Sequence, residues 1–189
     1  MLAHTAQLQL PEWLVQRLPQ LTATYATIEQ RMELAIDLAR QNVEQKSGGP
    51  FGAAIFDQSN GWLLGVGVNS VERCQASIAH AEIMAISMTQ NQLQTFDLGA
   101  GERALQLVSS AEPCAMCLAA IPWSGVKEVV CAARDEDVRA IGFDEGFKPI
   151  GWQENLAQAS ISARADVLRD QAVLVLEQYA AAGGTIYNP

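Results

Sequence analysis

The sequence predicts an α/β fold in which helices cover both faces of a β-sheet. A helical stripe of apolar residues runs through residues 28–43. Two apolar runs on either side of a turn, 51–56 and 62–68, are typical of an antiparallel hairpin. Further apolar runs at 105–109 and 127–132 are separated by a helical segment. Strands that alternate with helices form sheets covered on both faces, so we expect a layered α/β domain.

The first long helix is expected to begin directly after Thr27. Thr27 and Gln30 have the spacing of a capping box, and the Ser-Gly-Gly-Pro sequence further on is a strong helix break. Before this helix, an apolar segment at 13–18 lies between two prolines and predicts one or two helical turns packed on the body. We therefore expect an N-terminal extension, residues 1–25, followed by one main domain, residues 26–189.

The remaining elements follow from the same patterns of apolar residues and breaks. A helix that opens at His80 is expected after a loop, and it is rich in buried apolar residues. The other expected elements are a loop at 69–79, a short helix that begins at 134–137, a long loop at 143–158, a final strand at 160–167, a last helix at 168–182 and a tail at 185–189.

Composition limits the class of protein. The chain has 189 residues, of which 49% are hydrophobic, enough for one domain with a full core. It carries 21 acidic and 12 basic residues, for a formal net charge of −9. Because binding to nucleic acid requires a basic face, nucleic acid is not expected as the usual partner.

The cysteine count and the hydropathy pattern indicate where the protein works. Four cysteines without the spacing of a disulfide framework favour a reducing compartment. The first ten residues lack the basic start and apolar core of a signal peptide, and no apolar run reaches membrane-spanning length. A cytoplasmic protein that does not enter a membrane is expected.

Two short motifs predict a catalytic metal site. His80, Cys114 and Cys117 offer one imidazole and two thiolates, and three protein ligands are the number that leaves zinc an open fourth position. The cysteines are three residues apart at an expected helix start, which places both sulfurs on one face and favours thiolates. Glu82 lies two residues after the histidine, where it can move protons without being a ligand. His-x-Glu followed by Pro-Cys-x-x-Cys is the pattern of zinc nucleobase deaminases.

A non-catalytic use of the same residues is the alternative from another class of protein. A Cys-x-x-Cys pair also occurs in redox sites and in structural zinc sites. A zinc-stabilised interaction module would need a fourth protein ligand, for which Cys74 and Cys131 are the candidates. Such a module would give Glu82 no reason to lie at this spacing.

Beyond the zinc motifs, the sequence resembles the cytidine-deaminase-like superfamily and, within it, the bacterial guanine deaminases. The similar positions are the Gly-Pro-Phe-Gly-Ala strand start at 49–53, Asn69 eleven residues before the histidine, the helix with Trp123, the Gly-Phe-Asp-Glu segment that ends at Glu145, and Tyr187 near the C-terminus. The chain departs from the family by its N-terminal extension, by two residues after the tyrosine, and by glutamate in place of aspartate at 145.

The resemblance implies a three-layer α/β/α sandwich with a central five-stranded mixed sheet, one zinc ion per subunit and a homodimer. In some relatives the C-terminal segment is exchanged between subunits. It also implies how the site residues act. Phe51 would stack on the base, Asn69 would read its amide-like edge, Trp123 would line the pocket wall, and Tyr187 would close the pocket. Backbone N–H groups near Ala81 and Cys114 would orient either the zinc-bound oxygen or the base.

The implied reaction is the hydrolysis of guanine to xanthine and ammonia. Glu82 would carry the proton between water and the base, either alone or together with Glu145 as a second carboxylate. Two other enzymatic functions share the zinc motifs: a tRNA adenosine deaminase, which the acidic charge disfavours, and a cytosine or cytidine deaminase.

Overall fold

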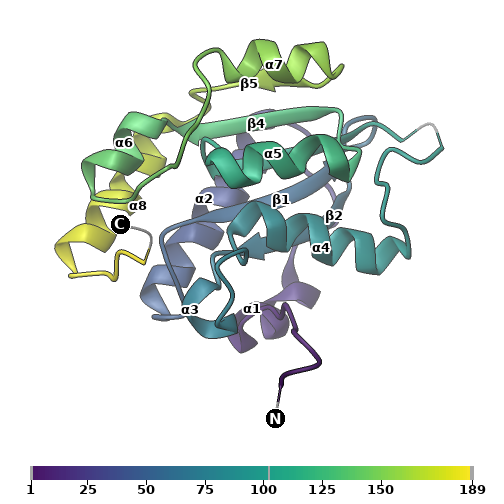
Figure 1. The fold of residues 1–189 in the computed structure, drawn as a ribbon. Helices are drawn as coiled ribbons and strands as arrows, with labels where there is room; N and C mark the ends of the chain where they lie inside the picture. The colour runs from purple at the N-terminus through teal and green to yellow at the C-terminus, as the bar shows by residue number, and fades with distance from the viewer. Residues whose placement is uncertain (1, 102, 188–189) are drawn as a thin grey trace.

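The computed structural model describes residues 2–101 and 103–187 (Figure 1). Its centre is one five-stranded mixed sheet with the order β2-β1-β3-β4-β5. β1 is antiparallel to both β2 and β3, whereas β3, β4 and β5 are parallel. The strands are β1 Gly52–Asp57, β2 Leu63–Val68, β3 Leu105–Ala111, β4 Glu128–Ala133 and β5 Ser162–Arg164.

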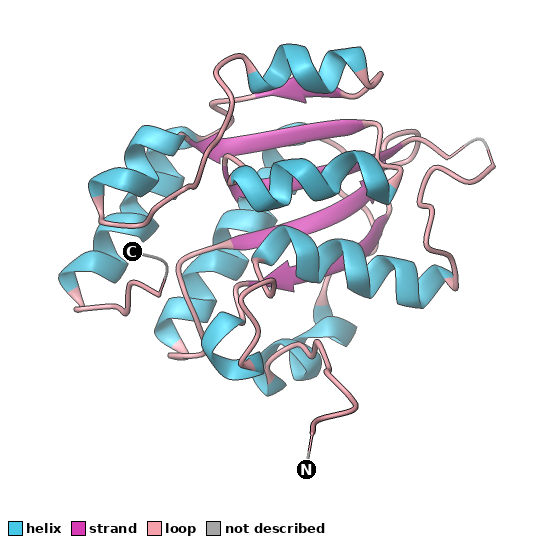
Figure 2. Ribbon diagram, viewed as in Figure 1, coloured by secondary structure: helices cyan, strands magenta, loops and turns pink. Residues whose placement is uncertain are grey.

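Helices cover both faces of this sheet, which confirms the three-layer α/β/α arrangement (Figure 2). α4 and α5 lie in front of the sheet in this view, and α2 and α8 lie behind it. The helices are α1 Glu12–Arg17, η1 Leu18–Gln20, α2 Ile28–Glu44, α3 Val71–Cys74, α4 Ala81–Leu93, α5 Ala115–Ser124, α6 Asp135–Ala140, α7 Trp152–Gln158 and α8 Arg169–Ala181.

Alternation along the strands divides the core in two. In β1, Ala54 and Phe56 belong to the cluster packed against α2 and α8, whereas Ala53 and Ile55 belong to the cluster packed against α4 and α5. Successive strand residues point to opposite faces, so a strand covered on both sides is apolar over most of its length. This explains why the strand sequences are largely apolar and do not alternate with polar residues.

The N-terminal end of α2 forms as its sequence predicts. The Thr27 hydroxyl accepts a hydrogen bond from the Gln30 N–H, and the Gln30 side chain accepts one from the Thr27 N–H, which is a complete capping box. The helix ends at Glu44, before the predicted Ser-Gly-Gly-Pro break.

Three segments differ from their sequence-based prediction. The loop predicted at 69–79 contains α3, and the loop predicted at 143–158 contains α7. Both are short, seven residues at most, so their apolar pattern is too brief to distinguish from a loop. The strand predicted at 160–167 is only three residues long, because Asp166 and Leu168 have positive φ and end the extended backbone.

The N-terminal extension packs against the main domain. Leu14 in α1 is fully buried in the core cluster beneath α2. The Ala23 carbonyl accepts a hydrogen bond from the Leu63 N–H, and Arg17 forms an ion pair with Asp37 of α2. The division at residue 25 stays a prediction about domain organisation.

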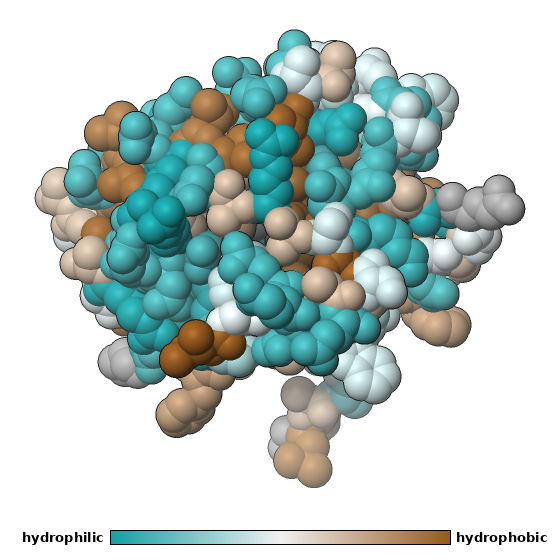
Figure 3. Space-filling view, turned by 90° about the horizontal axis from the view of Figure 1, so that it is seen from above, coloured by the Kyte–Doolittle hydropathy of each residue, from teal (hydrophilic) through white to brown (hydrophobic). Residues whose placement is uncertain are grey.

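The outer surface is mostly hydrophilic on the face seen in Figure 3, where apolar side chains form separate groups. Within the described ranges, none of the helices is long and apolar enough to cross a membrane.

Candidate active site

The site lies at one end of the sheet, because the antiparallel pairing brings three strand ends together there. Asn69 follows the last residue of β2, Glu112 follows the last residue of β3, and Phe51 precedes the first residue of β1. The register pairs Gly52 with Val68 and Ala53 with Ser109, so these ends are neighbours. Residues adjacent to the strand ends therefore face a common space.

Two helix N-termini add the metal-ligand residues. His80 is the N-cap of α4, and Glu82 lies in the first turn of that helix. Cys114 is the N-cap of α5, and Cys117 follows one turn later. Pro113 stands one residue before this N-cap.

The three donor groups are close enough to hold one metal ion. The Nδ1 atom of His80 lies 3.5 Å from the Sγ atom of Cys114, and the donor atoms of His80, Cys114 and Cys117 all lie within 4.8 Å of one another. Tetrahedral zinc, with bonds of about 2.0–2.3 Å to nitrogen and sulfur, separates its ligand atoms by roughly 3.3–3.8 Å. The donor set and its spacing therefore fit zinc.

Among the described residues, the two remaining cysteines are not part of this group. The Sγ atom of Cys74 contacts the Gln9 carbonyl, and the Sγ atom of Cys131 contacts the Arg164 carbonyl. The fourth protein ligand that a closed structural site requires is therefore not supplied by either of them.

The protein groups alone already favour a charged metal-binding cluster. A hydrogen bond from Cys117, together with His80, lowers the pKa of the Cys114 thiol to about 4. Burial opposes protonation of His80, but the hydrogen bond to Cys114 and the nearby negative charges raise the pKa of its imidazole. The hydrogen bond to Cys114 and burial raise the pKa of the Cys117 thiol. A cation bound here would replace the proton that the two thiols now share.

Two buried carboxyl groups flank the cluster. The Oε2 atom of Glu82 lies 3.5 Å from the Sγ atom of Cys117, and burial with the adjacent Cys114 raises the pKa of Glu82. Burial, Cys114 and Glu82 raise the pKa of Glu145 to about 8. Groups with raised pKa near a metal are suited to holding and delivering protons at neutral pH.

A small cavity joins these residues. It has about 20 Å³ of free space, and His80, Cys114 and Glu145 also line an adjoining groove of about 400 Å³. A volume of this size holds roughly one water molecule. The cavity is lined by Phe51, Asn69, His80, Ala81, Glu82, Ala111, Glu112, Cys114, Phe143, Glu145 and Tyr187.

The structure thus brings together every predicted site residue except Cys117 and Trp123 at the cavity wall, and Cys117 lies directly behind it. Trp123 does not belong there. It is near the C-terminal end of α5, whereas the metal ligands are at the N-terminal end, and it is 86% exposed. Its predicted place on the pocket wall is therefore wrong for this chain.

Aromatic rings form the other wall, including one that the sequence did not reveal. Phe143 packs edge-on against Phe51 at 5.2 Å between ring centroids and lies 5.0 Å from the ring of Tyr187. In the sequence, the position of Phe143 two residues before Glu145 could have indicated that it lies near the site. The Tyr187 hydroxyl is buried and has no hydrogen-bond partner among the described residues. A buried polar atom without a partner is typical of a position where a ligand supplies one.

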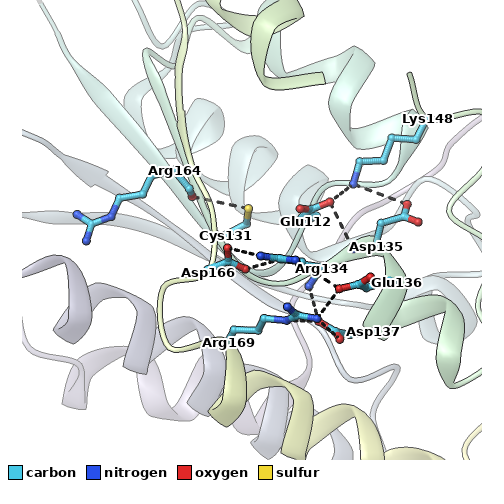
Figure 4. A network of polar contacts seen from close by, with 10 residues as sticks. All are labelled: Glu112, Cys131, Arg134, Asp135, Glu136, Asp137, Lys148, Arg164, Asp166 and Arg169. Atoms are coloured by element: carbon cyan, nitrogen blue, oxygen red, sulfur yellow. Dashed lines mark hydrogen bonds and ion pairs between the residues drawn. The ribbon is translucent and has the colours of Figure 1, made fainter. Parts of the chain in front are cut away.

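Glu145 is held in place by its own loop. Its backbone carbonyl accepts a hydrogen bond from the Ala115 N–H at the start of α5. Further along the loop, Lys148 forms an ion pair of 2.6 Å with Glu112, and both side chains are almost fully buried (Figure 4). The loop is thus fixed at Glu145 and again three residues later, to the two residues that flank Pro113-Cys114.

The fold and the site are those of a zinc-dependent hydrolytic deaminase. Comparison with known proteins supports this class of enzyme. The family model described as the cytidine and deoxycytidylate deaminase zinc-binding region matches residues 26–133. The chain belongs to this family.

Among curated relatives, the guanine deaminase of Bacillus subtilis (strain 168) is 37% identical over 116 residues, which is 61% of this chain and 70% of the relative. The solved structure of a guanine deaminase from Nitrosomonas europaea superposes with a TM-score of 0.89 at 42% identity, over 96% of this chain and 99% of the other. A structure of the protein NE0047 in complex with 2,6-diaminopurine has a TM-score of 0.89 at 45% identity and covers 96% of both chains.

Proposed function

We propose that this enzyme hydrolyses guanine to xanthine and ammonia. The observation that carries the proposal is the position of Glu82, a fully buried carboxyl group beside the His-Cys-Cys cluster in a cavity that Asn69 also lines. The similarity to guanine deaminases over nearly the whole chain supports the choice of substrate.

His80, Cys114 and Cys117 would hold zinc, whose chemistry is to act as a Lewis acid that makes water a nucleophile at neutral pH. Glu82 accepts the proton that water loses and delivers it to the ring nitrogen beside C2 of guanine. The hydroxyl group adds to C2, and the resulting tetrahedral carbon carries both oxygen and the amino group. Protonation of that amino group lets the exocyclic C2–N bond break and ammonia leave, and loss of the hydroxyl proton to a carboxylate leaves the C2 carbonyl of xanthine.

Glu145 is placed to supply the second proton. With a pKa of about 8, its carboxyl group still holds a proton at neutral pH and can donate it to the leaving amine. Glu82 can also make both transfers in turn. A Glu145→Gln enzyme decides between these schemes: it should keep its zinc, and unchanged turnover would remove Glu145 from the chemistry.

Recognition of the base falls to the walls of the cavity. The Asn69 amide is suited to the carbonyl and ring-nitrogen edge of guanine, because one amide group donates and accepts. Phe51 provides a stacking surface, and Tyr187, whose buried hydroxyl has no hydrogen-bond partner among the described residues, lines the same space. A purine is several times larger than the free volume, so we infer that the C-terminal tail with Tyr187 moves aside when the base binds.

A substrate screen tests the proposal against its enzymatic rivals. Ammonia release should be measured with guanine, adenine, cytosine and cytidine and with a tRNA that presents adenosine. We expect guanine to give the highest kcat/KM. The charge of −9 disfavours the tRNA substrate, since binding a polyanion requires a basic surface. Preference for any of the other substrates would overturn the assignment to guanine.

We also propose that the protein is a homodimer that works in the cytoplasm. The exposed face of α5 carries Trp123, and the nearby loop carries fully exposed Phe147 and Ile150. Large exposed apolar side chains beside a functional groove are typical of an interface. Tyr187 lies in the cavity of its own chain, and exchange of the C-terminal segments would place it at the same position in a second copy. The cysteines are unpaired, as in a reducing compartment.

A further inference from the structure

Asn42 is a fully buried polar side chain that no step of the reaction uses. It lies in the last two turns of α2 and is 0% exposed. Its Nδ2 atom donates to two carbonyl groups, that of Gly49 at 2.8 Å and that of Asn69 at 2.9 Å. Its Oδ1 atom accepts a hydrogen bond of 2.6 Å from the Ser47 hydroxyl. Both amide hydrogens and the amide oxygen therefore make short hydrogen bonds, and these bonds join α2 to two loops.

One of those loops carries the asparagine that reads the base. The Asn69 N–H donates to the Phe51 carbonyl at 3.0 Å, and the Asn69 carbonyl accepts from Asn42, so its backbone is held on both sides. Gly48 packs against the same carbonyl so closely that a Cβ atom would lie 2.0 Å from the Asn69 oxygen.

The Asn69 side chain itself is held only weakly. Its Oδ1 atom accepts two long hydrogen bonds of 3.4 Å, from the N–H groups of Gly49 and Val71. Within the described residues, its Nδ2 atom has no protein partner, which leaves both of its hydrogens for a ligand. Hydrogen bonds of this length are weak, so the orientation of the Asn69 side-chain amide depends on how firmly the Asn69 backbone is fixed.

The support continues into the N-terminal extension. The indole N–H of Trp13 in α1 donates to the Ser47 hydroxyl at 2.8 Å, and the Ser47 hydroxyl in turn donates to Asn42. Trp13, Ser47, Asn42 and Asn69 thus form one continuous hydrogen-bonded chain. With all three contacts made, the Asn42 amide is held in one orientation, whereas without the Ser47 hydroxyl only its two Nδ2 hydrogen bonds hold it.

We propose that Asn42 is a positioning residue for base discrimination, and that Ser47 and Trp13 fix its orientation. This rests on the proposed function, since it assigns Asn69 to the carbonyl edge of the purine. The extension then contributes to specificity through Trp13, although it does not reach the cavity. A site that hydrogen-bonds a substrate group discriminates against analogues that lack this group. The discrimination weakens when the hydrogen-bond donor is no longer held in the correct orientation.

The test compares two purines that lack the amino group and so cannot release ammonia from C2. Hypoxanthine carries the 6-oxo group, and unsubstituted purine does not. Their dissociation constants are measured by calorimetry on zinc-loaded protein. Asn42→Ala would leave two carbonyls without a partner and can prevent folding, so Ser47→Ala is the main variant. Loss of one buried hydrogen bond should weaken hypoxanthine binding about fivefold. Purine binding should change less than about twofold.

Rescue and matched controls separate positioning from general damage. Ser47→Thr keeps the hydroxyl and should restore the ratio of the two dissociation constants. Trp13→Phe should change it in the same direction but less. Ser59→Ala, in the turn between β1 and β2, and Trp62→Phe, which changes an exposed indole, should leave it unchanged. With guanine, Ser47→Ala should raise KM and leave kcat within about twofold.

Each other outcome overturns the inference. Equal losses for hypoxanthine and purine would show a merely structural role, as would failure of Ser47→Thr to restore the ratio. No change in Ser47→Ala, or no preference for hypoxanthine in the unchanged protein, would remove the role as well. Failure of the proposed function is a separate result, namely that the unchanged enzyme binds hypoxanthine preferentially but releases no ammonia from guanine.

Discussion

At the scale of the single residue, Glu82 carries the sharpest prediction. Glu82→Gln keeps the size of a side chain that is 6% exposed but removes its ability to take up and release a proton. Turnover should fall by about 10²–10⁴, the usual contribution of a general acid–base group. Zinc content, measured by elemental analysis, should stay at one ion per chain, because the donor atoms belong to His80, Cys114 and Cys117.

The control for this variant is Glu29→Gln, which changes an exposed glutamate in the first turn of α2. It should affect neither turnover nor zinc. Loss of zinc in Glu82→Gln alone would instead make Glu82 a metal ligand and would require a different proton carrier.

Glu145 predicts a pH dependence of stability in zinc-stripped protein. Its pKa is about 8 in the folded state against an ordinary value of 4.5. Between these values the folded state holds a proton that the unfolded state has lost, so stability falls as pH rises. The contribution is fully present below pH 4.5 and is lost as pH rises through about 8.

Glu145→Gln does not titrate and should remove this slope. Urea unfolding of both zinc-free proteins between pH 5 and 9 measures it, and parallel curves would show that burial does not hold the proton on Glu145. Added zinc should flatten the curve of the unchanged protein, because a cation favours the ionised carboxylate.

The residue scale also shows what sequence reasoning could reach at the site. The metal ligands and Glu82 were predictable because their chemistry requires particular residue types at fixed spacing. Trp123 and Phe143 were not, because an aromatic residue packs equally well in a core, a pocket or an interface. Only the three-dimensional position separates the exposed Trp123 from the buried Phe143.

At the scale of the element, the loop from residue 143 to α7 depends on one buried ion pair. The side chains of Lys148 and Glu112 are 7% and 11% exposed, and Lys148 also lies 5.3 Å from the centroid of the Trp152 ring. Lys148→Met would leave Glu112 charged without its main partner. The free energy of unfolding should fall by about 3–5 kcal/mol, as when one member of a buried pair is removed.

A second change tests whether the unpaired charge is the cause. Glu112→Gln added to Lys148→Met should recover much of the lost stability in urea unfolding, because the neutral amide has no charge to bury. Lys127→Met, at an exposed position, should change stability by less than about 0.5 kcal/mol. If the double variant were no more stable than Lys148→Met, packing on Trp152 would matter more than charge.

Elements were predictable in proportion to their length. The 17-residue α2 and the 13-residue α8 show several helical repeats, and β1, β3 and β4 are mostly apolar and buried over nearly their whole length. α7 has only two buried residues, Trp152 and Leu156, one turn apart. One such pair occurs as often in a loop, so the helix follows from packing onto β5 and not from local pattern.

At the scale of the whole molecule, the order of strands could not be read from the sequence. Apolar runs identify strands, but they do not say that β1 would lie between β2 and β3. That position creates the site, since the start of β1 then meets the ends of β2 and β3. The zinc motif implied such convergence without specifying which strands supply it.

The proposed dimer gives the last prediction, also at this scale. Trp123 is 86% exposed on an α5 surface that is almost wholly apolar. Placing a charge there, as in Trp123→Glu, removes a large apolar contact and forces desolvation of a carboxylate in the dimer. Central interface residues are worth at least about 2 kcal/mol, so the dimer dissociation constant should rise roughly 30-fold or more.

Sedimentation velocity over a range of concentrations measures this shift. Leu174→Glu is the matched control, because Leu174 is also an exposed apolar residue but lies on α8, on the opposite face of the sheet from α5. A Trp123→Glu protein that stays dimeric, or a Leu174→Glu protein that dissociates, would place the interface elsewhere. Because the groove beside Met116 and Phe147 adjoins the cavity, a monomeric Trp123→Glu protein should also show a raised KM for guanine. An unchanged KM in the monomer would mean that each chain completes its own binding site.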